Sequence, residues 1–216
     1  MNNFLVIFLF LTMVNFFTSN VFAVSLDEYL TNHGVTAEQN AGHMNIFPEY
    51  DAKAIYYKDM LMENSNIRTI AEIGFALGHS SDVYLNTRDD VEMVSFDIMY
   101  HWFNWIGKNY IDIKYPNRHI LLSGDSLKTV PFFVKKNPGK TFDLVIVDGG
   151  NEYLWALQDI INMRSLSCPD TILIVDDIEL EPVAKAYQEC IENGLVEEIE
   201  RRSGSGCGWV LGRYVQ

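Results

Sequence analysis

Residues 142–150 read FDLVIVDGG, an apolar run that ends on an acid followed by two glycines. Four consecutive apolar residues, three of them β-branched, are typical of a strand that is covered on both faces, as in a parallel sheet. Ligands bind at the carboxyl edge of open α/β sheets, so Asp148 is predicted to lie at a ligand-binding edge. The alternative for Asp148 alone is a cap of the following turn or helix.

The segments on either side of this strand alternate between strand and helix patterns. This order predicts an α/β fold: a doubly wound, mostly parallel seven-stranded sheet with helices on both faces and the last strand antiparallel. Ser126 is expected to cap the helix that carries Val130 and Phe133. The expected strands are 68–74, 91–96, 119–122, 142–147, 171–175, 195–200 and 208–214, and the expected helices are 51–63, 79–86, 100–110, 126–134, 152–166 and 182–192.

The amino-terminal segment has the composition of a leader. Residues 4–14, FLVIFLFLTMV, are apolar but for one Thr, and the small residues around Val21 and Ala23 predict a signal peptide 1–23 that is cleaved after Ala23. The protein is then expected in the secretory-pathway lumen or secreted, with no stable membrane span. Because no basic residue precedes the run, an uncleaved membrane anchor is the alternative. The chain divides into this leader, an N-terminal segment or lid at 24–50, and one domain at 51–216.

The charge balance limits the classes of partner. The chain of 216 residues has a formal net charge of −13, and its basic residues form no cluster longer than Arg201-Arg202. Nucleic acids and anionic membranes bind to basic surfaces, so neither is expected as a partner. Three scattered cysteines are too few for a disulfide scaffold or a zinc site. The oligomeric state stays open.

Acids and glycines recur where the predicted strands end. The first strand carries Glu72 and leads into a loop between Gly74 and Gly78, where glycine permits a sharp turn and close approach of a ligand. The following helix start, with Ser80, suits an anionic group. The next strand ends on Asp97, placed to accept hydrogen bonds from ribose hydroxyls. One strand further, Asp125 and Ser126 are expected near a base, so the edge is expected to bind a nucleoside with a short charged tail.

These motifs, AEIGFALGHSS, VSFDI, LLSGDS, FDLVIVDGG and LIVDDI, occur in the order seen in class I S-adenosylmethionine-dependent methyltransferases. From about Asp51 onward the chain resembles the small O-methyltransferases that act on catechol or caffeoyl-CoA, and their relatives of unassigned substrate. The resemblance implies that the Gly74–Gly78 loop and Ser80 hold the methionine part of S-adenosylmethionine. It places the ribose at Asp97 and the adenine near Asp125 and Ser126, and it implies methyl transfer to a small hydroxylated acceptor.

Two positions bear on the mechanism. In metal-dependent relatives, acids after the fourth and fifth strands hold Mg²⁺, which implies a metal site at Asp148, Asp176 and Asp177. The third position is Asp where Asn is usual, and the added charge favours Ca²⁺ or an empty site. The position of the usual general base holds Asn151, which takes no proton at neutral pH. Asp148 and Asn151 are therefore the candidate catalytic residues, with positioning as the main source of catalysis. A catalytically inactive binding protein of the same fold is the alternative.

Some neighbouring side chains carry two interpretations. His79 is expected to face solvent rather than the cofactor, and His43 is a candidate for acceptor binding in the lid. The aromatic stretch 99–105 either packs in the core or covers the adenine ring. Tyr153 and Trp155 either line an acceptor pocket or pack on the helix that follows.

Overall fold

The computed structural model describes residues 24–40, 51–203 and 208–215. Its centre is a seven-stranded sheet in the order β3-β2-β1-β4-β5-β7-β6. The strands from β1 to β5 are parallel, and β7 is antiparallel to both of its neighbours, which confirms the predicted fold. The strands are β1 Thr69–Ile73, β2 Glu92–Asp97, β3 His119–Ser123, β4 Phe142–Val147, β5 Ser167–Val175, β6 Val196–Arg202 and β7 Trp209–Tyr214.

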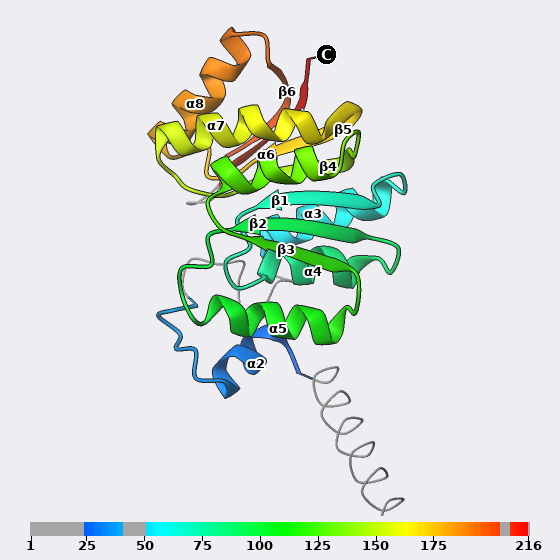
Figure 1. The fold of residues 1–216 in the computed structure, drawn as a ribbon, viewed down its shortest axis with the longest axis vertical. Coiled ribbons are helices and arrows are strands. Elements are labelled where there is room, and N and C mark those ends of the chain that lie inside the picture. Colours follow the sequence, from blue (N-terminus) through cyan, green and yellow to red (C-terminus); the bar gives the residue numbers. More distant parts are fainter. Residues whose placement is uncertain (1–23, 41–50, 204–207, 216) are drawn as a thin grey trace, which may run out of the picture.

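Helices cover both faces of the sheet (Figure 1). One apolar core joins one face to α2, α3, α4 and α5, and a second core joins the other face to α6, α7 and α8. Because β1 and β4 lie in the middle of the sheet and are covered on both sides, all but one residue of each strand is buried. The helices are α2 Leu26–Asn32, α3 Ala52–Glu63, α4 His79–Thr87, α5 Asn104–Lys114, α6 Ser126–Lys136, α7 Tyr153–Met163, followed by the short 3₁₀ helix η1 Arg164–Leu166, and α8 Glu181–Glu192.

One predicted helix start is wrong by several residues, and one predicted cap is wrong. Helix α5 begins at Asn104 rather than residue 100, because Met99 has a φ of 53° and turns the chain out of the helical conformation. Helix α6 is capped by Asp125 and not by Ser126: the Asp125 carboxylate accepts a hydrogen bond from the backbone N–H of Leu127 at 3.1 Å. Ser126 is instead the first residue of the helix.

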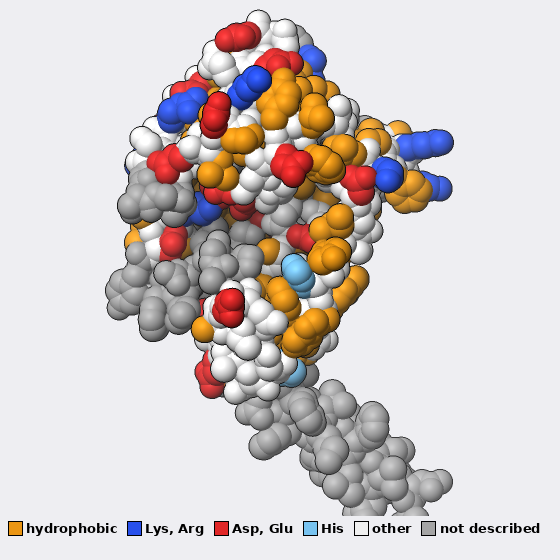
Figure 2. All heavy atoms as spheres, turned by 90° about the vertical axis from the view of Figure 1, so that its left-hand side faces the viewer, with side chains coloured by type: hydrophobic (Ala, Val, Ile, Leu, Met, Phe, Trp, Pro, Cys, Tyr) orange, Lys and Arg blue, Asp and Glu red, His pale blue; other side chains and the backbone are white. Residues whose placement is uncertain are grey.

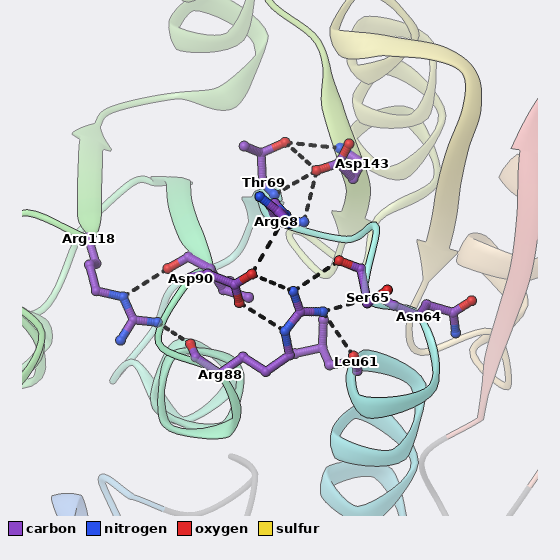
Figure 3. Close-up of polar contacts among 10 residues, drawn as sticks. Leu61, Asn64, Ser65, Arg68, Thr69, Arg88, Asp90, Arg118 and Asp143 are labelled. Atoms are coloured by element: carbon purple, nitrogen blue, oxygen red, sulfur yellow. Dashed lines mark hydrogen bonds and ion pairs between the residues drawn. The ribbon is translucent and has the colours of Figure 1, made fainter.

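At the amino-terminal edge of the sheet, charged side chains connect the turns (Figure 3). The Arg88 guanidinium donates to the carbonyl oxygens of Leu61, Asn64 and Ser65, which joins the end of α3 to the turn after α4. Asp143 at the start of β4 accepts hydrogen bonds from the backbone N–H of Thr69 at 2.8 Å and from its hydroxyl at 2.8 Å. These contacts lie at the edge opposite the carboxyl ends of the strands, so they hold the scaffold and not the site.

The described part of the N-terminal segment packs on the domain. Ser25 caps α2, whose Leu26 and Leu30 are buried in the first core. The Asn109 side chain of α5 donates to the Tyr29 hydroxyl at 2.7 Å. The predicted leader and the lid residues 41–50, including His43, lie outside the described residues. Among the helices that are described, none has the length and apolar character needed to cross a membrane.

Candidate functional site

The loop between β1 and α4 depends on two glycines. Gly74 has a φ of +100°, and a Cβ atom there would lie 1.8 Å from the carbonyl oxygen of Asp148. The loop after β1 and the loop after β4 therefore touch through their backbones. Gly78 has a φ of +86° and stands at the N-cap of α4, where the chain reverses into the helix. This geometry leaves the first backbone N–H groups of α4 pointing toward the edge of the sheet.

Glu72 lies beneath this loop and not on its surface. Its carboxyl is fully buried and accepts hydrogen bonds from the hydroxyls of Ser80, Ser81 and Ser95. Burial raises the pKa of Glu72 to about 7, against the effect of these three hydrogen bonds. The structure thus assigns Glu72 to supporting the glycine loop from below.

Asp97 joins the tip of β2 to the same loop. One carboxylate oxygen accepts hydrogen bonds from the backbone N–H of Phe75 at 2.9 Å and of Ala76 at 2.8 Å, and the other accepts one from Met99 at 2.6 Å. A carboxylate has about four lone-pair positions, and three are used here. About one acceptor position is therefore left for a ligand hydroxyl, fewer than the two ribose bonds expected from the sequence.

The next strand tip contributes Asp125 and Ser126 at the start of α6. Asp125 also forms an ion pair with Lys128 at 3.2 Å. Ser126 lies beside Asp159 of α7, whose carboxyl is buried. Burial raises the pKa of Asp159 to about 6. An ideal Cβ at Gly149 would lie 3.2 Å from this carboxyl, so Asp159 lies directly behind the loop that follows β4.

Three carboxylates meet at the ends of β4 and β5, and a lysine reaches them from another helix. Lys53 in the first turn of α3 forms an ion pair with the buried Asp176. Burial lowers the pKa of Lys53, but the charges of Asp148 and Asp176 raise it above its usual value. Burial and the charge of Asp176 raise the pKa of Asp148 well above its ordinary range. Asp177 accepts a hydrogen bond from the Asn151 amide at 2.9 Å, and burial raises its pKa.

This arrangement does not fit the divalent-metal site implied by the resemblance. Within residues 24–40, 51–203 and 208–215, no group of three or more His, Cys, Asp or Glu side chains is placed to hold a metal ion. One oxygen of Asp176 is bound to the Lys53 ammonium, and Asp177 is bound to Asn151. The predicted metal assistance at Asp148, Asp176 and Asp177 therefore finds no support in the geometry.

The strand tips surround a cavity of about 670 Å³, within the range of roughly 300–1,000 Å³ that is common for small-molecule sites. Its lining residues come from the carboxyl edge of the sheet. This edge lies on the left of Figure 1 and faces the viewer in Figure 2, where acidic and hydrophobic side chains lie close together. Glu72, Gly78 and Asp176 lie behind the wall. Of the predicted site residues, the cavity is lined by Gly74, Ser80, Asp97, Asp125, Ser126, Asp148, Asn151 and Asp177.

Some of the neighbouring side chains singled out in the sequence line the cavity, and others pack elsewhere. His79 was expected to face solvent, but it is buried, lines the cavity and lies 3.1 Å from the Asp27 carboxylate of α2. The cause is α2, which covers the start of α4. Tyr100 and Trp155 line the cavity. Tyr153 instead contacts α8, where its hydroxyl donates to Glu189.

Three residues of the site were not found from the sequence. Lys53 falls in the predicted helix 51–63, where a lysine in the first turn opposes the helix dipole and is a weak signal of a nearby acid. Gly107 of α5 lies so close to the glycine loop that a Cβ would be 2.1 Å from the Leu77 carbonyl oxygen. Asp159 is an acid within the apolar run 153–163, a visible sign of a buried polar contact.

Comparison with known proteins agrees with this geometry. Residues 71–178, half of the chain, match the family described as "Methyltransferase domain". No curated protein sequence matches the chain significantly.

Solved structures share the fold at low sequence identity. The O-methyltransferase from Bacillus cereus, solved in complex with SAH, is 17% identical with a TM-score of 0.68, covering 94% of this chain and 97% of that one. The O-methyltransferase TomG from Streptomyces achromogenes, involved in tomaymycin synthesis and solved with SAM, is 16% identical with a TM-score of 0.68, covering 88% and 89%. The sheet order, the loop geometry and the family match lead to one conclusion: the chain belongs to the methyltransferase-domain family.

Proposed function

We propose that this protein binds S-adenosylmethionine at the carboxyl edge of its sheet and transfers the methyl group to a hydroxyl oxygen of a small acceptor. The observation that carries the proposal is the shared cavity, which brings the glycine loop, Asp97, and the Asp125–Ser126 pair to one wall. Two solved proteins of the same fold contain SAH or SAM. The cofactor's chemistry is that of a sulfonium methyl donor, and the chain's own residues bind and orient it.

Each part of the wall suits a different part of the cofactor. The start of α4 offers backbone N–H donors for the carboxylate of the methionine part, while the Ser80 hydroxyl, which lines the cavity, donates to Glu72 below the loop. Asp97 has an acceptor position left for a ribose hydroxyl. Asp125 and Ser126 are one strand further along the edge, on the side that we assign to the adenine. Tyr100 adds an aromatic face to the cavity.

The acceptor is proposed to lie on the opposite side, near Asp148, Asn151 and Trp155. Trp155 suits a small planar acceptor, because an aromatic ring packs on another ring or an apolar face. Asn151 cannot accept a proton, so its role is to orient Asp177 through their hydrogen bond. Catalysis then rests on alignment of the acceptor oxygen with the methyl carbon.

Titration calorimetry of the protein with S-adenosylmethionine, without added metal, tests the proposal. We expect binding by the wild type and a loss of about tenfold or more in affinity for Asp97→Ala, since a hydrogen bond to a charged group is removed. Asp143→Ala is the matched control. It also removes a carboxylate that accepts backbone N–H bonds at a strand end, but at the far edge of the sheet, so it should leave affinity unchanged. Absence of binding by the wild type would contradict the proposal.

The second candidate is a binding protein of the same fold without catalysis, and Asn151 is the observation that favours it. A panel of small phenols and other hydroxylated compounds, with release of S-adenosylhomocysteine as the readout, separates the two. Turnover with any acceptor supports the enzyme. Tight cofactor binding without turnover across the panel supports the binding protein.

We also propose a secretory-pathway location, supported by the apolar run at residues 4–14 and the small residues before position 24. Amino-terminal sequencing of the protein from a secreting host should begin at Val24. An intact Met1 together with sedimentation in the membrane fraction would support the anchor instead.

A further inference from the structure

The acids at the ends of β4 and β5 form a cluster of negative charge with its own cation. Val147 and Val175 are register partners in the parallel sheet, so Asp148 and Asp176 leave neighbouring strand tips together. Asp177 follows with a φ of +55°, which is uncommon for a residue other than glycine. One oxygen of Asp176 is buried and has no hydrogen-bond partner among the described residues.

Lys53 enters this cluster from a distant part of the chain. It lies in the first turn of α3, 123 residues before Asp176, and its side chain is only 14% exposed. A lysine at this end of a helix opposes the helix dipole, and burial of an ammonium group costs free energy. The unfavourable dipole interaction and the cost of burial are offset only while the ammonium group stays bound to the carboxylates. Lys53 also lines the cavity beside Asp148 and Asp177, so its charge reaches the acceptor side of the site.

We propose that the Lys53 ammonium group is the cation of this acid cluster, and that it holds the acceptor oxygen in place of a divalent metal ion. This inference rests on the proposed function. An ammonium group has three N–H donors, and the bond to Asp176 uses one, which leaves donors for an oxygen in the cavity. A divalent ion bound to the same carboxylates would lie within a few ångströms of the ammonium charge and be repelled by it.

The reaction then runs without metal. The proton of the acceptor hydroxyl first passes to water at the cavity mouth, and the Lys53 ammonium, which keeps its own proton, stabilises the resulting oxyanion. An electron pair of this oxygen then forms a bond to the methyl carbon, and the carbon–sulfur bond breaks with its electron pair remaining on sulfur. The sulfonium becomes a neutral thioether.

Titration with MnCl₂ alone, without cofactor, tests which cation the cluster holds. We expect the wild type and Lys53→Arg, which keeps the charge, to bind Mn²⁺ no more tightly than millimolar. Lys53→Met leaves three carboxylates without their cation, and carboxylates suit Mn²⁺. Its affinity should rise by about tenfold or more. Micromolar binding by the wild type that Asp177→Asn weakens would overturn the proposal, as would a Lys53→Met variant with no gain in affinity.

If Lys53→Met does not fold, the wild type decides the question. An NMR signal of the Lys53 ammonium that is unchanged by millimolar MgCl₂ supports the proposal, whereas its displacement by MgCl₂ overturns it. The S-adenosylmethionine titration fails or succeeds independently of both results. Cofactor binding together with tight Mn²⁺ binding would remove this inference and leave the proposed function in place.

Discussion

At Gly74 the carbonyl oxygen of Asp148 occupies the space that a side chain would need. The residue's φ of +100° adds a second requirement, because residues with a Cβ atom rarely adopt it. Contact with the neighbouring loop was not predicted from the sequence, although the need for glycine was. A single hydrogen atom in place of a methyl group thus keeps two loops of the cavity wall together.

Gly74→Ala should lower the free energy of unfolding by about 3 kcal/mol or more, because strain and overlap with a backbone atom add together. It should also abolish binding of S-adenosylmethionine. Gly139→Ala is the matched control: its φ is +78°, but no atom lies within 4 Å of the added Cβ. Urea unfolding should show a loss of only about 1 kcal/mol for the control. Equal losses for the two variants would mean that the contact with Asp148 is easily relieved.

Glu72 predicts how stability depends on pH. Its folded-state pKa of about 7 lies above the ordinary value of 4.5, so the folded protein binds a proton more strongly than the unfolded chain. The stability from this group is fully present below about pH 4.5 and is lost as the pH rises through 7. Glu72→Gln should remove this loss, on the order of 2–3 kcal/mol.

The measurement is urea unfolding at several pH values from 4.5 to 8, with Glu92→Gln as an exposed control in β2.

His119 changes stability in the opposite sense. Burial lowers its pKa to about 3, so its contribution is lost as the pH falls below 6.5. Both variants retain His119. The difference in free energy of unfolding between each variant and the wild type therefore reports the substituted carboxyl group. If the free energy of unfolding of Glu72→Gln changed with pH in parallel with that of the wild type, the raised pKa of Glu72 would be contradicted.

Among the elements, α5 shows how a helix positions a loop. Its Gly107 lets the helix backbone approach the Leu77 carbonyl oxygen, which fixes one side of the glycine loop. The sequence pattern predicted a helix in this region but started it four residues early, because the aromatic stretch 99–105 has helix-compatible residues. The left-handed conformation of Met99, held by the Asp97 carboxylate, ends the strand and delays the helix.

Gly107→Ala is expected to destabilise the protein, although alanine is the better helix former by about 1 kcal/mol. The added Cβ would lie 2.1 Å from a backbone oxygen, and such overlap typically costs about 1–3 kcal/mol or more. Thermal unfolding should therefore show a lower Tm, and calorimetry a weaker affinity for S-adenosylmethionine. Asp112→Ala on the exposed face of α5 is the control and should change stability by no more than about 0.5 kcal/mol. A Tm raised by Gly107→Ala would show that the higher helix propensity of alanine outweighs the overlap with the Leu77 carbonyl oxygen.

At the scale of the whole molecule, the N-terminal segment shares a core with the sheet. Leu30 of α2 is 1% exposed and belongs to the same apolar cluster as β1 and β4. Asp27 of the same helix reaches His79 at the cavity. The division into a segment at 24–50 and a domain at 51–216 thus follows the composition of the chain, whereas the described part of the segment, residues 24–40, packs as part of the domain.

Leu30→Ala should therefore lower the free energy of unfolding of the whole protein by about 2–5 kcal/mol, in a single transition. Leu154→Ala makes the same change at an exposed position of α7 and should cost no more than about 0.5 kcal/mol. Circular dichroism and tryptophan fluorescence, followed through urea unfolding, give the two values. A small early transition for Leu30→Ala, with the main one unchanged, would mean that α2 folds separately.

The sequence by itself determined the order of strands and helices, the antiparallel last strand and the acids and glycines at the strand tips. These features follow from local rules: the spacing of apolar residues, the conformational freedom of glycine, and the parallel sheet that collects strand ends at one edge. Only the tertiary structure decided that Glu72 lies beneath the loop, that Asp97 uses most of its acceptor positions for backbone N–H groups, and that Lys53 forms an ion pair with Asp176 at the end of β5. The physical reason is that these partners are far apart in the chain, so the packing of α3 and the loops determines which charges and hydrogen-bonding groups meet.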